Sequence, residues 1–176
     1  MSRKAIGTCA LRRKGGDGIE EEAMRGGERA LGSCVPTSPG ALATKHVFHA
    51  VSAWNEVSCV GRAFARALLL SDEHGCQSLA VPALGTGAAR VSLEQCAVAM
   101  ATRLRWHAML GGMRLRELTV VLSTEEKRRA FQEITAEVLG VSGADVGTSD
   151  VGLPADNLPL SPEAATFLDP SSRSRA

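Results

Sequence analysis

The sequence predicts an α/β fold, a three-layer α/β/α domain with a mostly parallel sheet, from three observations. Short runs of β-forming residues alternate with stretches in which apolar residues recur at helical spacing. Glycine-rich turns separate these runs, as is typical of strands and helices that follow one another along a chain. The chain has 176 residues, of which 44% are apolar, so it can form one domain with a core, plus a tail.

Charge and cysteine content exclude several classes of protein. The formal net charge of +1 favours neither a specific nucleic-acid partner nor a membrane, although residues 1–139 are mildly basic and residues 140–176 acidic. Five cysteines without a C-x-x-C pair argue against a disulfide framework and a zinc site, so we expect no metal. Without a long apolar run or a cleavable signal, we expect an intracellular, cytoplasmic protein, or a nuclear one if its source is eukaryotic.

The first part of the chain predicts few regular elements. Residues 5–11 form a short apolar run that predicts a strand. Residues 19–31 predict a helix with three glutamates in its first turn, where the helix dipole favours negative charge, and Gly26 and Gly27 should weaken its second half. Residues 32–42, rich in Gly, Ser, Pro and Thr, predict a loop.

The central part predicts a strand, a helix and a second strand. Residues 45–51 are rich in β-formers, and apolar residues then recur at helical spacing between positions 57 and 68. The helix should end at His74 and Gly75 and return the chain to a buried strand at residues 78–83. We therefore expect a right-handed crossover between two parallel strands.

Two further helices and one more strand complete the predicted domain. Ser92 and Gln95 predict a capping box at the start of a helix. Residues 115–122 predict a third clear strand, and Ser123 with Glu126 predicts a second capping box that opens the last helix.

A glycine-bracketed turn between a strand and a helix is the best candidate for a binding site. The strand at residues 78–83 leads into this turn, and the capped start of a helix follows it. Gly85 and Gly87, on either side of Thr86, let a ligand approach the backbone, whose N–H groups point outward at one spot. Such a turn suits an anion, most often a phosphate, but an ordinary βα loop fits the spacing equally well.

This turn resembles a known ligand-binding loop. The segment Val81-Pro82-Ala83-Leu84-Gly85-Thr86-Gly87 resembles the second ligand-binding loop of macrodomains, the modules that bind ADP-ribose and related nucleotides. The resemblance implies that backbone amides hold the diphosphate, with ligand contacts from Leu84, Gly85, Thr86, Gly87, Ala88, Ala89 and Arg90. Macrodomains usually have an aromatic residue and a glycine where this chain has Ala89 and Arg90, so the arginine either holds a phosphate or blocks the cleft.

A second glycine-rich turn resembles the family more distantly. The segment Gly15-Gly16-Asp17-Gly18-Ile19 is similar to the macrodomain turn before the second helix, which implies ligand contacts at Gly15 and Gly16. Asp17 is the nearest counterpart of the catalytic aspartate of hydrolytic members, although a turn or N-cap role explains it as well. The resemblance also places Ser123 near the adenosine.

The resemblance covers residues 15–139 and excludes both ends of the chain. Residues 1–14 form an N-terminal segment of uncertain role, and residues 140–176 predict a disordered acidic tail. Macrodomains carry a strand that ends in an Asn-Ala-Ala-Asn-like segment before the glycine turn, whereas this chain has only two asparagines, Asn55 and Asn157. We therefore expect a macrodomain-like fold that is incomplete at its N-terminus, in a chain that begins inside the domain or is a degenerate relative.

Two functions from different classes are compatible with these observations. The first is a module that binds ADP-ribose or another nucleoside diphosphate, with weak or no ADP-ribosyl hydrolase activity and without a cofactor. Its partner would be ADP-ribose or an ADP-ribosylated protein. The alternative is a macrodomain remnant that binds no ligand and acts as a protein-interaction or scaffold part, completed by another chain that supplies the missing strands.

Overall fold

The structure is a computed structural model that describes residues 6–52, 56–87, 89–111 and 114–142. Its elements are, in chain order, α1 (Ile6–Gly15), α2 (Gly18–Met24), β1 (Cys34–Thr37), β2 (Val47–Ala50), α3 (Val57–Glu73), β3 (Ser78–Pro82), α4 (Leu93–Met109), β4 (Glu117–Val121) and α5 (Glu125–Leu139). Among the described helices, none combines the length and the apolar character needed to cross a membrane.

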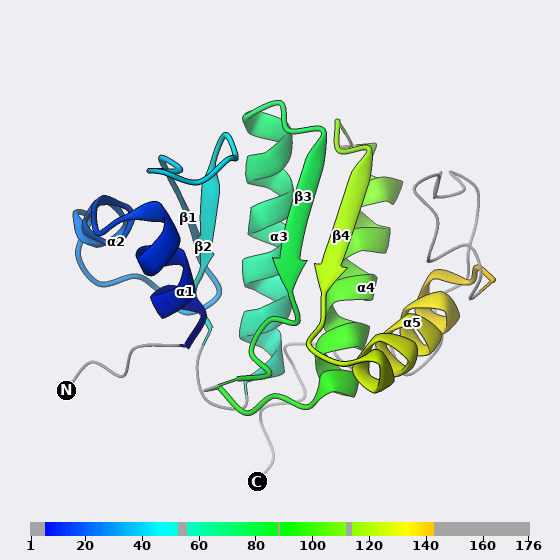
Figure 1. Ribbon diagram of the computed structural model, residues 1–176. Helices are drawn as coiled ribbons and strands as arrows, with labels where there is room; N and C mark the ends of the chain where they lie inside the picture. The colour runs from blue at the N-terminus through cyan, green and yellow to red at the C-terminus, as the bar shows by residue number, and fades with distance from the viewer. Residues whose placement is uncertain (1–5, 53–55, 88, 112–113, 143–176) are drawn as a thin grey trace, which may run out of the picture.

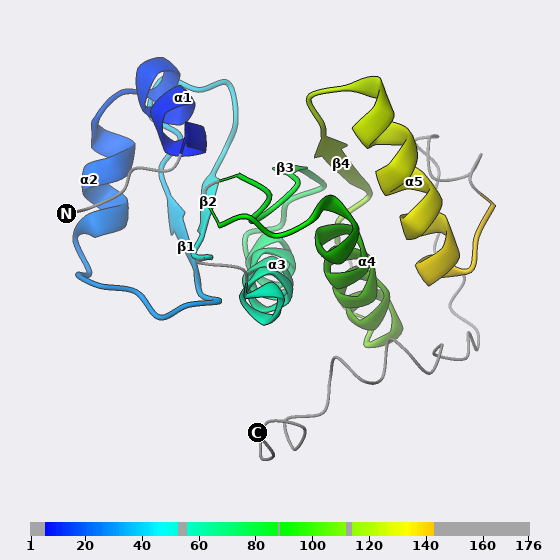
Figure 2. The same cartoon turned by 90° about the horizontal axis from the view of Figure 1, so that it is seen from below.

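The helices lie on both sides of the strands, which confirms the predicted α/β/α layers (Figures 1 and 2). Helices α3 and α4 lie side by side on one side of the strands, α5 packs against α4, and α1 lies toward the other side of the strands (Figure 2). Along the strand layer, α1 and α2 accompany β1 and β2 at one end of the molecule, and α5 accompanies β4 at the other (Figure 1).

The described strands pair in two separate sheets. Strands β1 and β2 are antiparallel, with Cys34 opposite Ala50, and strands β3 and β4 are parallel, with Ser78 opposite Glu117. Helix α4 makes the crossover between β3 and β4, as a parallel pair requires. The predicted parallel pairing across α3 is not found among the described residues, because β2 and β3 belong to different sheets.

The core lies between α3, α4 and the strands β3 and β4. On α3, Val60, Phe64 and Leu68 recur every four residues and share one face of the helix, and all three are fully buried. They pack against buried residues of other segments, namely Val81, Val91, Cys96, Ala97, Met100, Leu115 and Phe131. Burying each large apolar side chain contributes about 1.5–3 kcal/mol, so this cluster fixes the helices on the β3–β4 sheet.

The N-terminal part differs from the prediction. The strand predicted at residues 5–11 is wrong, because α1 covers this region as a helix. The last turn of α1 carries Arg12, Arg13 and Lys14, whose positive charges suit the C-terminal end of a helix dipole. The predicted helix at residues 19–31 is shorter than expected, since α2 ends at Met24 before the two glycines.

The predicted loop at residues 32–42 contains strand β1. Pro36 obscures this strand in the sequence, because proline has no N–H to donate and is depleted from strands. The structure tolerates Pro36 because β1 pairs only with β2 among the described strands and has an edge without a partner.

The helix ends largely follow the predicted capping signals. Ser92 Oγ accepts a hydrogen bond from the Gln95 amide at 3.1 Å, which confirms the predicted cap of α4. The predicted cap of α5 is displaced by one residue: the hydroxyl of Thr124, rather than that of Ser123, accepts from the Lys127 amide at 3.3 Å. Thr124 sits in an extended conformation directly before the helix, which is the geometry an N-cap requires.

Candidate functional site

The β3–β4 sheet brings two predicted ligand segments to one edge. Pro82 at the end of β3 lies opposite Val121 at the end of β4, so both carboxyl ends stop at the same level. The binding loop, defined here as residues 84–90, follows β3, and Ser123 follows β4. In open α/β sheets, ligands bind outside the carboxyl ends of parallel strands, so this edge is the candidate site.

Gly85 is the point at which the binding loop rests on the core. Its φ angle of +77° lies in the left-handed region, and a Cβ there would lie 2.8 Å from Val60 Cγ2 and 3.1 Å from Val91 Cγ2. The Val91 amide donates to the Gly85 carbonyl at 3.0 Å, and the Thr86 hydroxyl donates to the Ala83 carbonyl at 2.9 Å. Glycine is therefore required at this position, and the turn closes on itself.

Three consecutive amides of the binding loop are available to a ligand. Within the described part of the chain, the N–H groups of Gly85, Thr86 and Gly87 have no hydrogen-bond acceptor. Gly87 is exposed, and a Cβ built on it would meet nothing within 4 Å, so solvent reaches the backbone here. The loop leads directly into the Ser92-capped start of α4. Free amides beside a helix N-terminus form a site for an anion.

The second half of the binding loop contains an unusual backbone conformation. Arg90 is the non-glycine residue with positive φ in the described part of the chain, at 55°. Its amide donates to the Gly87 carbonyl at 3.0 Å, and the side chain is exposed, so the guanidinium can reach a ligand at this edge. Ala89 packs against the core, and Ala88 lies outside the described residues. Strain of this kind is frequent at binding sites, where the surrounding structure must hold it.

The turn with Gly15 and Gly16 joins α1 to α2, and its groups serve this connection. The Gly15 carbonyl accepts from the Ala41 amide at 3.0 Å, and the space for a Cβ at Gly15 is filled by the side chains of Ile19 and Leu42. The Gly16 amide donates to the Arg12 carbonyl at 2.8 Å, with a φ of +92° at the end of the helix. Both glycines therefore have a structural role, and their ligand contacts stay a prediction.

Asp17 is exposed and engaged with its own segment. Its side chain is 66% exposed and forms an ion pair with Arg12, while its carbonyl accepts from the amides of Glu20 and Glu21 at the start of α2. Helices α1 and α2 lie beside β1 and β2, whereas the binding loop follows β3 (Figures 1 and 2). The structure thus supports the turn role of Asp17, and its catalytic role stays a prediction.

Ser123 is exposed at the end of β4 and bound by a lysine. Its hydroxyl accepts from Lys127 Nζ at 3.2 Å, one turn into α5. This places a hydroxyl and a cation at the same sheet edge as the binding loop. The sequence pointed to Ser123 but missed Lys127, because a lysine in a charged helix face carries no signal of its own.

A polar cluster beside β1 also escaped the sequence analysis. Glu22 on α2 accepts hydrogen bonds from the hydroxyl of Ser38 at 2.5 Å and from its amide at 3.0 Å, and these bonds lower the pKa of Glu22. Next to it, Thr37 Oγ1 lies 3.0 Å from His49 Nε2, and burial lowers the pKa of His49. The residues come from three segments, so only the folded chain brings them together. The Glu22–Ser38 contact fastens α2 to the segment after β1, and the Thr37–His49 contact joins β1 to β2.

Comparison with known proteins shows the family. The model of the Macro domain family matches residues 7–100. An uncharacterized protein of Aeropyrum pernix is 35% identical over 144 residues, which covers 77% of this chain and 73% of the relative. Among solved structures, the macro domain of ganglioside induced differentiation associated protein 2 aligns with a TM-score of 0.66 at 14% identity, covering 77% of this chain and 70% of that one.

A second solved structure carries a ligand. The Trypanosoma brucei macrodomain in complex with ADP-ribose aligns with a TM-score of 0.65 at 18% identity, covering 70% of this chain and 54% of that one. Identities this low show a common fold and nothing more. The match of the family model over residues 7–100 and the relative of 35% identity show that this chain belongs to the Macro domain family.

Proposed function

We propose that the chain binds ADP-ribose, free or attached to a protein, and holds its diphosphate in the binding loop. The observation that carries this proposal is the run of amides at Gly85, Thr86 and Gly87, which have no acceptor among the described residues and precede the start of α4. Members of the family bind ADP-ribose, and a solved macrodomain of the same fold is a complex with ADP-ribose. Arg90 is exposed in the same loop and would add a positive charge.

The energetics allow useful affinity from this loop alone. Hydrogen bonds to a charged group contribute about 1.5–3 kcal/mol each, and the loop offers three amides to the diphosphate. A Kd near 1 μM requires about 8 kcal/mol, which such contacts and a guanidinium can supply. The proposal is limited to binding, because Asp17, the acidic residue expected in hydrolysis, is exposed and paired with Arg12.

Isothermal titration calorimetry with ADP-ribose, with AMP as the control ligand, tests the proposal. Gly87→Glu is the informative variant, because a Cβ added at Gly87 meets no atom within 4 Å and the exposed position leaves the rest of the side chain toward solvent. The added carboxylate would lie where the diphosphate binds and repel it. Gln77→Glu is the matched control, since Gln77 is exposed before β3, at the opposite end of that strand.

The outcomes are distinct. We expect micromolar binding of ADP-ribose, weaker binding of AMP, loss of binding in Gly87→Glu and unchanged binding in Gln77→Glu. If a sample folded by circular dichroism gives no heat with ADP-ribose, the loop is an inherited geometry without this ligand. Equal losses in both variants would also contradict the proposal.

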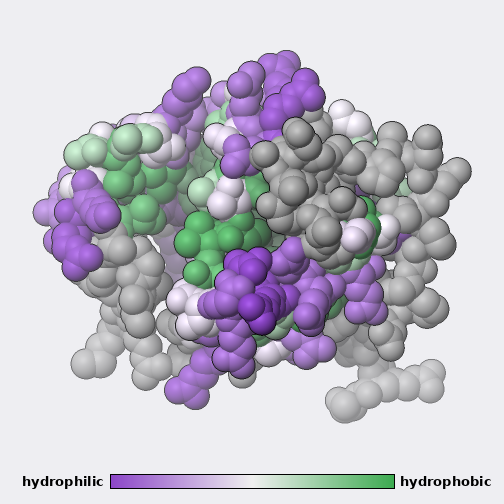
Figure 3. Space-filling model, turned by 45° about the vertical axis from the view of Figure 1, so that its right-hand side comes forward, coloured by the Kyte–Doolittle hydropathy of each residue, from purple (hydrophilic) through white to green (hydrophobic). Residues whose placement is uncertain are grey.

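A second candidate function is an interaction module completed by a strand from another chain. Two observations favour it: the described strands form two separate pairs with open edges, and the outer face of the β3–β4 sheet is exposed at Ala80, Pro82 and Val121. Val121 is 58% exposed, and apolar surface gathers in the middle of the face in Figure 3. Open edges and apolar faces are typical sites of association.

Hydrogen exchange of the purified chain tests this alternative. In a monomer, the amides along the open edges of β2 and β3 should exchange quickly, whereas those paired between β3 and β4 should be protected. Protection of the open edges that appears only at high concentration would show that a second chain adds a strand. Slow exchange at these edges in a monomer by light scattering would contradict the candidate.

A further inference from the structure

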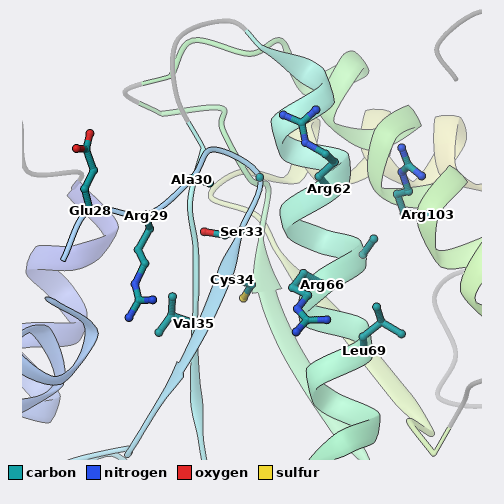
Figure 4. Close-up of a pocket in the computed structure, with 12 residues that line it drawn as sticks. Glu28, Arg29, Ala30, Ser33, Cys34, Val35, Arg62, Arg66, Leu69 and Arg103 are labelled. Atoms are coloured by element: carbon teal, nitrogen blue, oxygen red, sulfur yellow. The ribbon is translucent and has the colours of Figure 1, made fainter. Parts of the chain in front are cut away.

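A pocket of about 600 Å³ opens on a part of the molecule that the binding loop does not reach. Its walls come from the segment before and at the start of β1, from the outer face of α3 and from α4 (Figure 4). The lining residues include none of residues 84–90, so this pocket is separate from the proposed ADP-ribose site.

The pocket is strongly basic. Arg62 and Arg66 lie one turn apart on α3, Arg103 lies on the adjacent α4, and Arg29 lies on the far side of the strand segment (Figure 4). Glu28 is the one acidic residue among its described lining residues. Four guanidinium groups against one carboxylate leave an excess of positive charge in a chain whose total charge is only +1.

Two of these four arginines have no partner in the described part of the chain. Arg62 Nη2 lies 3.7 Å from Glu56 Oε1 and 3.4 Å from Cys59 Sγ, so Arg62 has partners, neither of which lines the pocket. Arg66 and Arg103 make neither a hydrogen bond nor an ion pair with any residue in the described ranges. Like charges that share a pocket repel each other. An anion placed between them relieves this repulsion and is therefore bound more strongly.

Glycines hold two of these arginines close to the backbone. A Cβ on Gly32 would lie 2.6 Å from Arg62 Nε, and a Cβ on Gly61 would lie 3.3 Å from Arg103 Nε. The guanidinium groups therefore occupy space that a side chain at Gly32 or Gly61 would fill. Ser33 Oγ, in the same wall, is buried without a hydrogen-bond partner in the described part of the chain. A hydroxyl can donate to a phosphate oxygen.

We propose that this pocket is a second anion site and that it binds linked phosphate groups, as in a phosphodiester or polyphosphate chain. The planar guanidinium presents paired donors that match phosphate oxygens, and several guanidiniums in one pocket favour a ligand with more than one phosphate. The described lining contains no aromatic residue to stack on a base. Recognition is therefore of phosphate and independent of base sequence.

Calorimetric titration of the full chain with two probes tests this inference. The probes are sodium tripolyphosphate and a short single-stranded oligodeoxythymidylate, which carry linked phosphates from the two possible sources. The test variant is the double substitution Arg66→Gln and Arg103→Gln. The matched control is Arg116→Gln, which removes an exposed arginine outside the pocket. Circular dichroism verifies that both variants fold.

We expect at least one probe to bind, with a Kd that rises about tenfold or more in the double variant and changes little in Arg116→Gln. Binding should weaken as salt is added. The slope of the logarithm of the binding constant against the logarithm of the salt concentration should be shallower in the double variant, because fewer counterions are released. Binding of the oligonucleotide identifies a phosphodiester chain as the ligand, and binding of tripolyphosphate alone identifies a free polyphosphate.

Two results would overturn the inference: absence of binding by both probes at low salt, or equal weakening in the double variant and in Arg116→Gln. The Gly87→Glu variant separates this site from the ADP-ribose site. It should keep its affinity for the phosphate probes, and saturating ADP-ribose should not displace them. Competition by ADP-ribose would place the phosphates in the binding loop and also contradict a second site.

Discussion

Gly85 in the binding loop lies directly against Val60 on α3, so close that a Cβ on the glycine would be 2.8 Å from Val60 Cγ2. Val60 is fully buried in the core. The position of the three free amides in the loop is thus set by a core residue of another element. A change in either residue should affect ligand binding and stability together.

Gly85→Ala should therefore destabilise the protein by about 2–3 kcal/mol, part from the positive φ and part from the contact with Val60. Gly75→Ala is the matched control, because Gly75 has a φ of +64° and nothing within 4 Å of a Cβ. Gly75→Ala should lower the free energy of unfolding by only about 1 kcal/mol, because alanine is strained in the left-handed conformation. Urea denaturation measures both.

The contact with Val60 can be isolated in a double variant. Val60→Ala makes room for the new methyl group, so the loss in the Gly85→Ala, Val60→Ala protein should be smaller than the sum of the single losses. Strict additivity of the two changes would show that the contact does not restrict the loop.

Arg90→Gly should leave stability within about 1 kcal/mol, because glycine adopts the φ of 55° without the steric cost that arginine carries. We expect ADP-ribose binding to weaken about tenfold, the effect of losing one charge-assisted contact. Arg90→Lys keeps the charge and should lose less. Calorimetry decides: tighter binding by Arg90→Gly would show instead that the arginine blocks the cleft.

The fold could be predicted where the signal is local. The apolar stripe of α3 and the Ser92 cap of α4 depend on residues within a few turns, and both appear as expected. Strand β1 could not be predicted, because Pro36 and its short length resemble a loop and only pairing with β2 makes it a strand. The N-terminal helix α1 was missed because its apolar run is too short to show a helical period.

The candidate site could be predicted only in part, for the same physical reason. Glycine spacing around Thr86 indicated a turn at the end of a strand, and the turn lies there. The contact between Gly85 and Val60 joins separate elements and leaves no pattern in the sequence. At Gly15 and Gly16, a similar glycine pattern ends a helix, since a positive φ serves both helix ends and ligand loops.

A polar pair of buried His107 and partly buried Asp72 joins the last turns of α3 and α4. His107, which is 8% exposed, places Nε2 at 2.9 Å from Asp72 Oδ2, and Asp72 Oδ1 accepts from the Arg114 amide at 2.8 Å. Asp72→Ala should cost about 1–3 kcal/mol, because it leaves two donors without their acceptor. Glu73→Ala, at the exposed neighbouring position, is the control and should cost less than about 0.5 kcal/mol. Similar denaturation midpoints for both would show that the pair does not hold the helices together.

The buried cysteines should resist modification while the protein is folded. Burial raises the pKa of the Cys96 thiol to about 12 and that of Cys34 to about 11, so almost none of either thiol is ionised at pH 8. Among the four cysteines whose burial the structure describes, Cys76 is partly exposed and should react first with iodoacetamide, whereas Cys34 and Cys96 should react only after unfolding. Peptide mass spectrometry of the native and the guanidinium-unfolded chain measures each site separately.

Because the folded state keeps a proton that the unfolded thiol loses above its ordinary pKa of 9.0, raising the pH toward 11 should lower stability and expose both sites. Labelling of Cys96 in the native protein at pH 8, at the rate of Cys76, would mean that the α3–α4 core opens far more often than its packing implies.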